Sequence, residues 1–125
     1  MSGSYLVCDQ GMTYAEAQVL CESAGMRIAR IDSAEENTWV AGLVMDPWLG
    51  GNSLVADDEW YWEDGELFWL GYFDGAAQNG SFTSWAGLNP SASPADADCA
   101  RIDSGTGNWV DIFCLSSKPT VCELY

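Results

Sequence analysis

The first part of the chain carries one strand-like pattern and one clear helical pattern. Residues 5–8 (Tyr-Leu-Val-Cys) predict a short strand. Thr13-Tyr14-Ala15-Glu16 forms a capping box, in which the threonine hydroxyl and the glutamate carboxylate satisfy free amides at a helix start. Apolar residues follow at helical spacing, and Gly25 is a natural stop. We therefore expect a helix from this box to Gly25, with Cys21 on its buried face.

The next segment predicts a strand and a second helix. Residues 26–31 read as a strand, and Ser33-Ala34-Glu35-Glu36 is a second capping box. An apolar stripe follows at Val40, Leu43 and Val44. Pro47 is expected to end this helix, since proline lacks the amide that a helix interior needs.

After Trp48 the helical period disappears, and short apolar runs rich in aromatic residues and glycine take its place. Residues 60–62 predict a strand that enters a turn, and residues 100–102, 109–112 and 120–122 predict short closing strands. Residues 71–98 show little periodicity, and so long a stretch in a compact domain is usually a functional loop. Early helices followed by short strands predict an α+β fold.

Length and charge narrow the function. The chain has 125 residues, which suits one domain, and no run of apolar residues is long enough for a transmembrane helix. We assign residues 1–4 to a linker remnant and residues 5–125 to the domain. The net charge is −15, so the surface repels phosphate backbones and we expect no nucleic-acid binding. The same charge is also what keeps a protein soluble in a salty environment.

Histidine is absent, which removes the commonest general base and the commonest zinc ligand. Neither a nucleophile elbow nor a lysine–serine pair appears, so we expect a binding module rather than an enzyme. Any bound metal is expected to be a hard ion such as calcium, which prefers oxygen ligands. The five cysteines form no CxxC pair, so disulfides explain them better than zinc does, and the odd number leaves one thiol over.

Several short motifs follow one another in the order and spacing of a known family. The chain resembles the C-type lectin-like domains through the following residues: Tyr14-Ala15-Glu16-Ala17, Cys21, Ile28, Ile31, Ser33-Ala34-Glu35-Glu36-Asn37, Trp48-Leu49-Gly50, Trp62-Glu63-Asp64-Gly65, Phe82-Thr83-Ser84-Trp85, Cys99, Trp109-Val110-Asp111, Cys114 and Cys122. The resemblance implies two helices flanking short antiparallel sheets, a long loop region, and a secreted or cell-surface location. It also assigns Trp48, Trp62, Trp85 and Trp109 to the core.

The resemblance further implies two disulfides, Cys21–Cys122 and Cys99–Cys114. Cys8 is then left over. It is either a buried free thiol or the site of a bridge to another chain, which would make an oligomer.

Sugar-binding members of this family hold calcium at the tip of the long loop. At the corresponding positions this chain has Asn89, Ser91, Ala97, Val110 and Asp111. Only Asp111 is retained outright and Asn89 still offers a carbonyl oxygen, so we expect the usual calcium site to be degenerate. The remaining metal candidates are Asn89, Asp98 and Asp111. A second group of carboxylates is either a different calcium site or a solvated acidic face: Asp57, Asp58, Glu59, Asp74, Asp96 and Asp98.

The segment from Gly71 to Asp98 is therefore the expected ligand-binding surface. The first hypothesis is a glycan-binding module whose polar contacts are Asn89, Ser91, Asp98 and Asp111. Aromatic side chains at or near the loop, Trp60, Trp69, Tyr72 and Phe73, supply rings that stack on the apolar faces of sugars. The alternative is a protein-binding or adhesion domain that has lost the sugar chemistry, and a surface for ice or mineral is a third use of the fold. No membrane insertion is expected.

Overall fold

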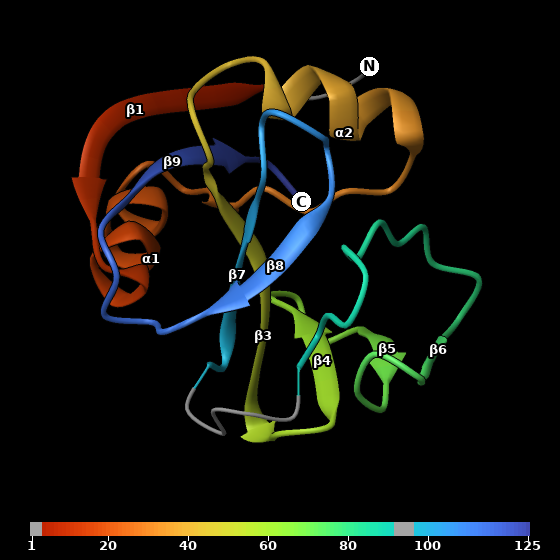
Figure 1. Cartoon of the computed structure of the whole chain (residues 1–125). Helices are drawn as coiled ribbons and strands as arrows, with labels where there is room; N and C mark the ends of the chain where they lie inside the picture. The colour runs from red at the N-terminus through yellow and green to blue at the C-terminus, as the bar shows by residue number, and fades with distance from the viewer. Residues whose placement is uncertain (1–3, 92–96) are drawn as a thin grey trace.

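The computed structural model describes residues 4–91 and 97–125 and shows two helices and two antiparallel sheets (Figure 1). A three-stranded sheet has the order β1-β9-β2, and a six-stranded sheet has the order β6-β5-β4-β3-β7-β8. The predicted α+β architecture is confirmed. The elements are β1 (Tyr5–Met12), α1 (Tyr14–Ser23), β2 (Arg27–Ile28), α2 (Ala34–Ala41), β3 (Trp48–Ala56), β4 (Glu59–Trp62), β5 (Leu67–Leu70), β6 (Ala76–Ala77), β7 (Cys99–Ile102), β8 (Trp109–Ile112) and β9 (Lys118–Glu123).

Helix α1 follows the prediction closely. The Thr13 hydroxyl accepts a hydrogen bond from the Glu16 amide at 3.2 Å, and the Thr13 amide donates to the Glu16 carboxylate at 2.9 Å. The capping box is thus complete. Gly25 follows the helix with a positive φ of 72°, a conformation that glycine adopts without strain. Cys21 is fully buried, as expected.

Helix α2 is shorter than its pattern indicated. Ser33 caps it by accepting from the Glu36 amide at 3.1 Å, but the Glu36 carboxylate reaches the amide of Asp32, and the second capping box is only half formed. The helix ends at Gly42, whose amide already bonds the carbonyls of the last turn. The prediction that Pro47 ends this helix is therefore wrong. No helix in the part of the chain that the structure describes is long and apolar enough to cross a membrane.

Two predicted strands have different lengths in the structure. Strand β1 runs on past residue 8 to Met12, because it pairs with β9 as far as Lys118. The strand expected over residues 26–31 is reduced to β2. The Ala29 amide still donates to the Val121 carbonyl at 2.8 Å, but the Arg30 amide donates to the side chain of Glu123, so the backbone pairing with β9 stops there.

Both predicted disulfides are present. Cys21–Cys122 joins α1 to β9 with a Cα–Cα distance of 5.4 Å, and Cys99–Cys114 closes a shorter loop with a distance of 5.1 Å. On the chain-entropy model, loops of these sizes stabilise the fold by roughly 4.7 and 3 kcal/mol. Cys8 is a free, half-buried thiol on β1.

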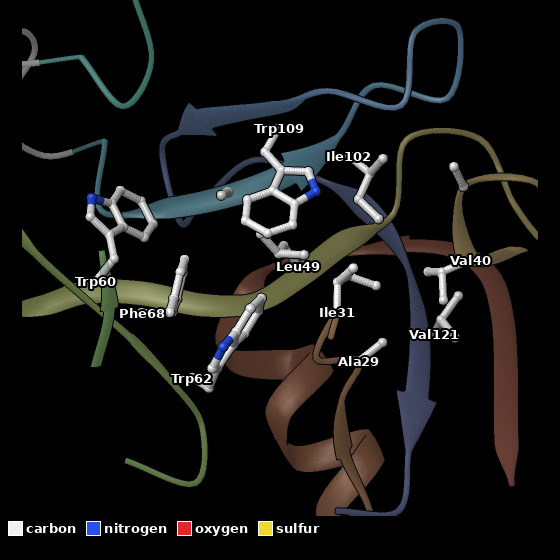
Figure 2. Close-up of a cluster of buried hydrophobic side chains, with 12 residues drawn as sticks. Ala29, Ile31, Val40, Leu49, Trp60, Trp62, Phe68, Ile102, Trp109 and Val121 are labelled. Atoms are coloured by element: carbon white, nitrogen blue, oxygen red, sulfur yellow. The ribbon is translucent and has the colours of Figure 1, made fainter. Parts of the chain in front are cut away.

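The hydrophobic core contains a cluster of aromatic rings from β4, β5 and β8 of the six-stranded sheet (Figure 2). Trp62 stacks on Phe68 with ring centroids 4.0 Å apart, and both rings meet Trp109 edge-on. Trp60 is only 1% exposed and belongs to this core. Its grouping with the loop aromatics is therefore wrong, because β4 alternates and turns Trp60 and Trp62 to the same, buried side.

Asn37 is a buried polar residue that joins α2 to this core. Its side-chain oxygen accepts from the Trp109 indole N–H at 2.8 Å, and its amide nitrogen donates to the Gly107 carbonyl at 2.7 Å. Trp109 is completely buried, so its indole N–H has no access to water as an alternative partner.

We expect Asn37→Ala to lower the free energy of unfolding by about 2–3 kcal/mol, because it leaves the buried Trp109 N–H without a partner and the Gly107 carbonyl with the Ser84 hydroxyl alone. Urea denaturation measures the effect. Thr38→Ala, an exposed change on the same helix, is the control and should alter the midpoint little. Equal stability of the two variants would contradict a role for Asn37 in holding the core.

Two glutamates lie side by side where α2 meets β9. Glu36 accepts from the Tyr5 hydroxyl at 2.9 Å and from the Asp32 amide at 2.8 Å. Glu123 is buried and hydrogen-bonded to Glu36. Burial is the larger cause that raises its pKa to about 8, and the hydrogen bond to Glu36 is the second. Two carboxyl groups in contact disfavour the ionisation of both, so burial and the neighbouring Glu36 favour the protonated form of Glu123.

The raised pKa of Glu123 predicts a pH-dependent stability. A carboxyl whose pKa is higher in the folded state stabilises the fold below its ordinary pKa, near 4.5, and this contribution is lost as the pH rises through about 8. We expect the melting temperature to fall by several degrees over this window. Glu123→Gln, which keeps a permanent hydrogen-bond donor, should flatten the profile, while the exposed Glu35→Gln should not. Parallel profiles for all three proteins would show that Glu123 does not cause the fall.

Candidate functional site

The long loop begins in a tight turn after β5. Gly71 has a φ of 110°, and a Cβ added at Gly75 would lie 2.2 Å from the Leu70 carbonyl oxygen, so the turn requires glycine at both positions. The Tyr72 carbonyl accepts from the Trp69 indole N–H at 3.0 Å and from the Gly75 amide at 2.9 Å. Phe73, at the apex, is left 53% exposed.

The rest of the loop is more regular than its sequence pattern predicted. Strand β6 pairs with β5, and Trp85 forms an isolated bridge with Trp109. The Trp109 amide donates to the Ser84 carbonyl at 2.7 Å, and the Ala86 amide donates to the Trp109 carbonyl at 2.9 Å. The loop is therefore bound to β8 at its middle, and its side chains there have defined positions. Residues 92–96, which include Asp96, lie outside the described residues.

A groove of about 280 Å³ opens on this loop. Its apolar wall consists of Trp69, Phe73, Trp85 and Leu88, and its polar groups come from residues 83, 84 and 89. Trp69 meets Trp85 edge-on with centroids 6.3 Å apart. We call this the loop groove. It combines rings with a few hydroxyl and amide groups, the usual composition of a small-molecule site.

Three of the predicted polar contacts come together beside the loop groove. The Ser91 amide and hydroxyl both donate to the Asp111 carboxylate, each at 2.9 Å, and the Asp111 amide donates to the Asn89 side-chain oxygen at 3.3 Å. The Asn89–Pro90 peptide bond is cis. Asp111 is buried, and burial raises the pKa of its carboxyl group, while the hydrogen bonds from Ser91 oppose the rise.

The other predicted residues are placed differently. The Asp98 carboxylate accepts from the Ser53 hydroxyl at 3.1 Å, and the Asp98 backbone carbonyl accepts from the Ser53 amide at 2.9 Å, so both groups bond to β3. Trp69 and Phe73 line the loop groove, whereas Tyr72 is half-buried and is not part of its lining. Trp85, predicted as core, contributes to both the core and the groove, because its position between Trp60 and Trp69 gives it one inner and one outer neighbour.

These residues do not fit a calcium ion in the geometry of the sugar-binding family members. Calcium needs six to eight oxygens, and the side chains of Ala97 and Val110 supply none. The Asp111 carboxylate already accepts hydrogen bonds from Ser91, and the Asn89 oxygen accepts from a backbone amide. What remains is a cluster that holds its own hydrogen bonds.

The second group of carboxylates is spread over several turns and strands. Asp57 and Asp58 are exposed in the turn between β3 and β4, and the Glu59 carboxylate accepts from the Tyr61 hydroxyl at 2.8 Å. Over residues 4–91 and 97–125, no three histidine, cysteine or acidic side chains lie close enough together to hold a metal ion. For the described members, the arrangement corresponds to a solvated acidic face.

The chain matches one family model and resembles several known proteins. Residues 10–124 match the family model described as the Lectin C-type domain. The human protein "Lymphocyte antigen 75" is 29% identical over 116 residues, and the "Type-2 ice-structuring protein" of Hemitripterus americanus is 29% identical over 118 residues. Each alignment covers 90% of this chain, but only 6% of the first relative and 63% of the second.

Solved structures show the same fold at lower identity. The herring type II antifreeze protein superposes with a TM-score of 0.80 at 23% identity and covers 98% of this chain and 91% of its own. The carbohydrate-recognition domain of cow CD23, solved in the presence of an oligosaccharide, gives a TM-score of 0.78 at 22% identity and covers 95% of this chain and 84% of its own.

The donor set at Asn89, Ser91 and Asp111 predicts that calcium does not stabilise the protein through this cluster. We expect the melting temperature to differ between millimolar calcium and a chelator by the same amount in Asp111→Asn as in the wild type. A specific site would raise the midpoint by mass action, about 2.7 kcal/mol at a hundredfold excess over its dissociation constant. A calcium-induced rise that Asp111→Asn abolishes would overturn this expectation.

Proposed function

We propose that this chain, which belongs to the C-type lectin domain family, binds glycans outside the cell through the loop groove and without calcium at the Asn89–Asp111 cluster. Domains of this family are binding modules and not enzymes, in agreement with the absence of catalytic motifs. The observation that carries the proposal is the groove itself, whose lining combines Trp69, Phe73 and Trp85 with hydroxyl and amide groups.

The groove suits a sugar ring for two physical reasons. The exposed faces of Phe73 and Trp69 offer stacking area to the apolar C–H face of a pyranose. Thr83, Ser84 and Asn89 can then meet the hydroxyls at the ring edge, which fix its orientation. Its volume of about 280 Å³ lies just below the usual range for ligand pockets, about 300–1,000 Å³. We therefore assign it to one terminal sugar residue rather than to a long chain.

The Asn89–Ser91–Asp111 cluster has a supporting role in this proposal. Its hydrogen bonds tie the end of the loop to β8, so the groove is ordered before a ligand arrives. A preformed site avoids part of the entropy cost of binding. The two disulfides, which are typical of proteins in oxidising compartments, support a location outside the cell.

Binding to a protein is the second candidate, and the exposed apolar residues beside the groove favour it. Leu88 is 70% exposed and Phe73 53%. A protein partner would cover both side chains, whereas a single sugar ring would cover only part of this surface.

Phe73→Ala should weaken glycan binding about tenfold, because it removes the most exposed stacking ring of the groove. A glycan array identifies the ligand, and titration calorimetry with the best glycan measures the loss. Phe113→Ala is the matched control, since Phe113 is 48% exposed and does not line the groove. It should leave the affinity unchanged.

The same experiments distinguish the two functions. Glycan binding that persists in a chelator and is lost in Phe73→Ala supports the proposal. An array without a ligand, in either calcium or chelator, would refute it. Equal losses in Phe73→Ala and Phe113→Ala would move the site away from the loop groove.

A further inference from the structure

A second groove, of about 830 Å³, lies between α1 and the hairpin of β3 and β4. Its walls come from the second half of α1, the turn before β2, the two hairpin strands, the turn at Glu63 and the last residue, Tyr125. We call it the α1 groove. In Figure 1, α1 lies to the left of β3 and the segment after β6 lies to the right, so the α1 groove is separate from the loop groove.

The α1 groove carries negative charge at its centre. Glu63 lies half-buried there and accepts hydrogen bonds from Gln18 at 2.7 Å, the Ile28 amide at 2.9 Å and the Tyr14 hydroxyl at 3.1 Å. Burial raises the pKa of Glu63, and the nearby charge of Glu22 acts in the same direction. Helix α1 ends at this groove without a basic residue in its last turn, so the negative end of its dipole adds to the field.

The one cationic side chain among the described residues that line the α1 groove is already engaged. The Arg27 guanidinium lies over the Tyr125 ring, 5.4 Å from its centroid, and donates to the Tyr125 backbone oxygen. The carboxylates of Glu22 and Glu63 have no basic partner in the described structure.

Apolar and aromatic side chains complete the groove. Met26 and Val55 offer aliphatic surface, and Tyr61 and Tyr125 offer rings. Val55 is 77% exposed. A ligand with an apolar stem and a cationic end would satisfy both kinds of surface, since ammonium groups favour carboxylates and aromatic faces.

We propose that the α1 groove binds a lysine side chain presented by a partner protein, with the ammonium group at Glu22 and Glu63 and the methylene stem along Val55 and Met26. A lysine fits better than an arginine because both oxygens of Glu63 already accept hydrogen bonds. A bidentate guanidinium contact needs both oxygens, whereas an ammonium group needs a single free lone pair. The exposed Val55 then also contacts the protein surface around the lysine.

The test uses a short peptide with one lysine, acetyl-Gly-Lys-Gly-amide, and the same peptide acetylated on the lysine nitrogen. We expect the lysine peptide to shift the backbone amide resonances of Tyr61, Glu63 and Gly65 in the folded protein. The acetylated peptide should leave them in place. Glu22→Gln and Glu63→Gln should each weaken the binding about threefold to fivefold, as expected for a partly exposed ion pair.

Glu35→Gln is the matched control, because it removes the same charge from an exposed position on α2. It should leave the affinity for the lysine peptide unchanged. Glu22 is exposed, so Glu22→Gln keeps the test valid even if Glu63→Gln lowers the melting temperature. An equal loss in the control, or equal shifts with the acetylated peptide, would overturn the proposal. Glycan binding by Glu22→Gln is expected to match the wild type, so the two proposed sites succeed or fail separately.

Discussion

Much of the structure depends on how the Trp109 side chain is held. Its ring receives the edges or faces of rings from β4, β5 and the long loop, and its indole N–H donates to Asn37 on α2. Its backbone N–H and C=O are bonded to the loop at Ser84 and Ala86. A single buried residue therefore joins the helix, the sheet and the loop. Asp111 lies two positions further along β8. Because Trp109 fixes this strand, it also fixes the position of Asp111 and of the cluster that Asp111 forms with Ser91.

The sequence predicts an element well where its local pattern favours the same conformation that its packing in the fold requires. The Thr13 box and the periodic residues up to Cys21 describe α1 correctly, because one face of this helix packs against β9 and the disulfide fixes it there. Helix α2 shows the opposite case. Leu43 and Val44 continue its apolar stripe and do pack against the core, but they do so from irregular backbone after Gly42. Apolar spacing reports which side chains are buried and leaves the backbone conformation open.

The loop groove was harder to predict for a related reason. Trp69 and Phe73 were recognised as contact residues because they are aromatic and occur next to an irregular segment. Trp85 and Leu88 were not, since Trp85 matches a core position and Leu88 has no pattern around it. Both residues reach the groove because the loop is bonded to Trp109 of β8. This is a long-range contact that no local sequence feature records. The α1 groove was missed for the same reason: its residues come from six separate segments.

The cluster at Asp111 shows what takes the place of a metal ion in holding such a loop. In a calcium-binding arrangement, carboxylate and amide oxygens from the loop and from β8 share one ion. Here the Ser91 hydroxyl and amide supply the positive ends of two dipoles to the Asp111 carboxylate, and Asn89 accepts from the backbone of the same residue. A serine can do this at the position where a larger ligand side chain would face the ion, and Ala97, which is buried, has no side-chain polar group that needs a partner. The loop is thus held by direct hydrogen bonds that need no ion. In a chain with a net charge of −15, the Asp111 carboxylate is held by hydrogen-bond donors of the loop itself.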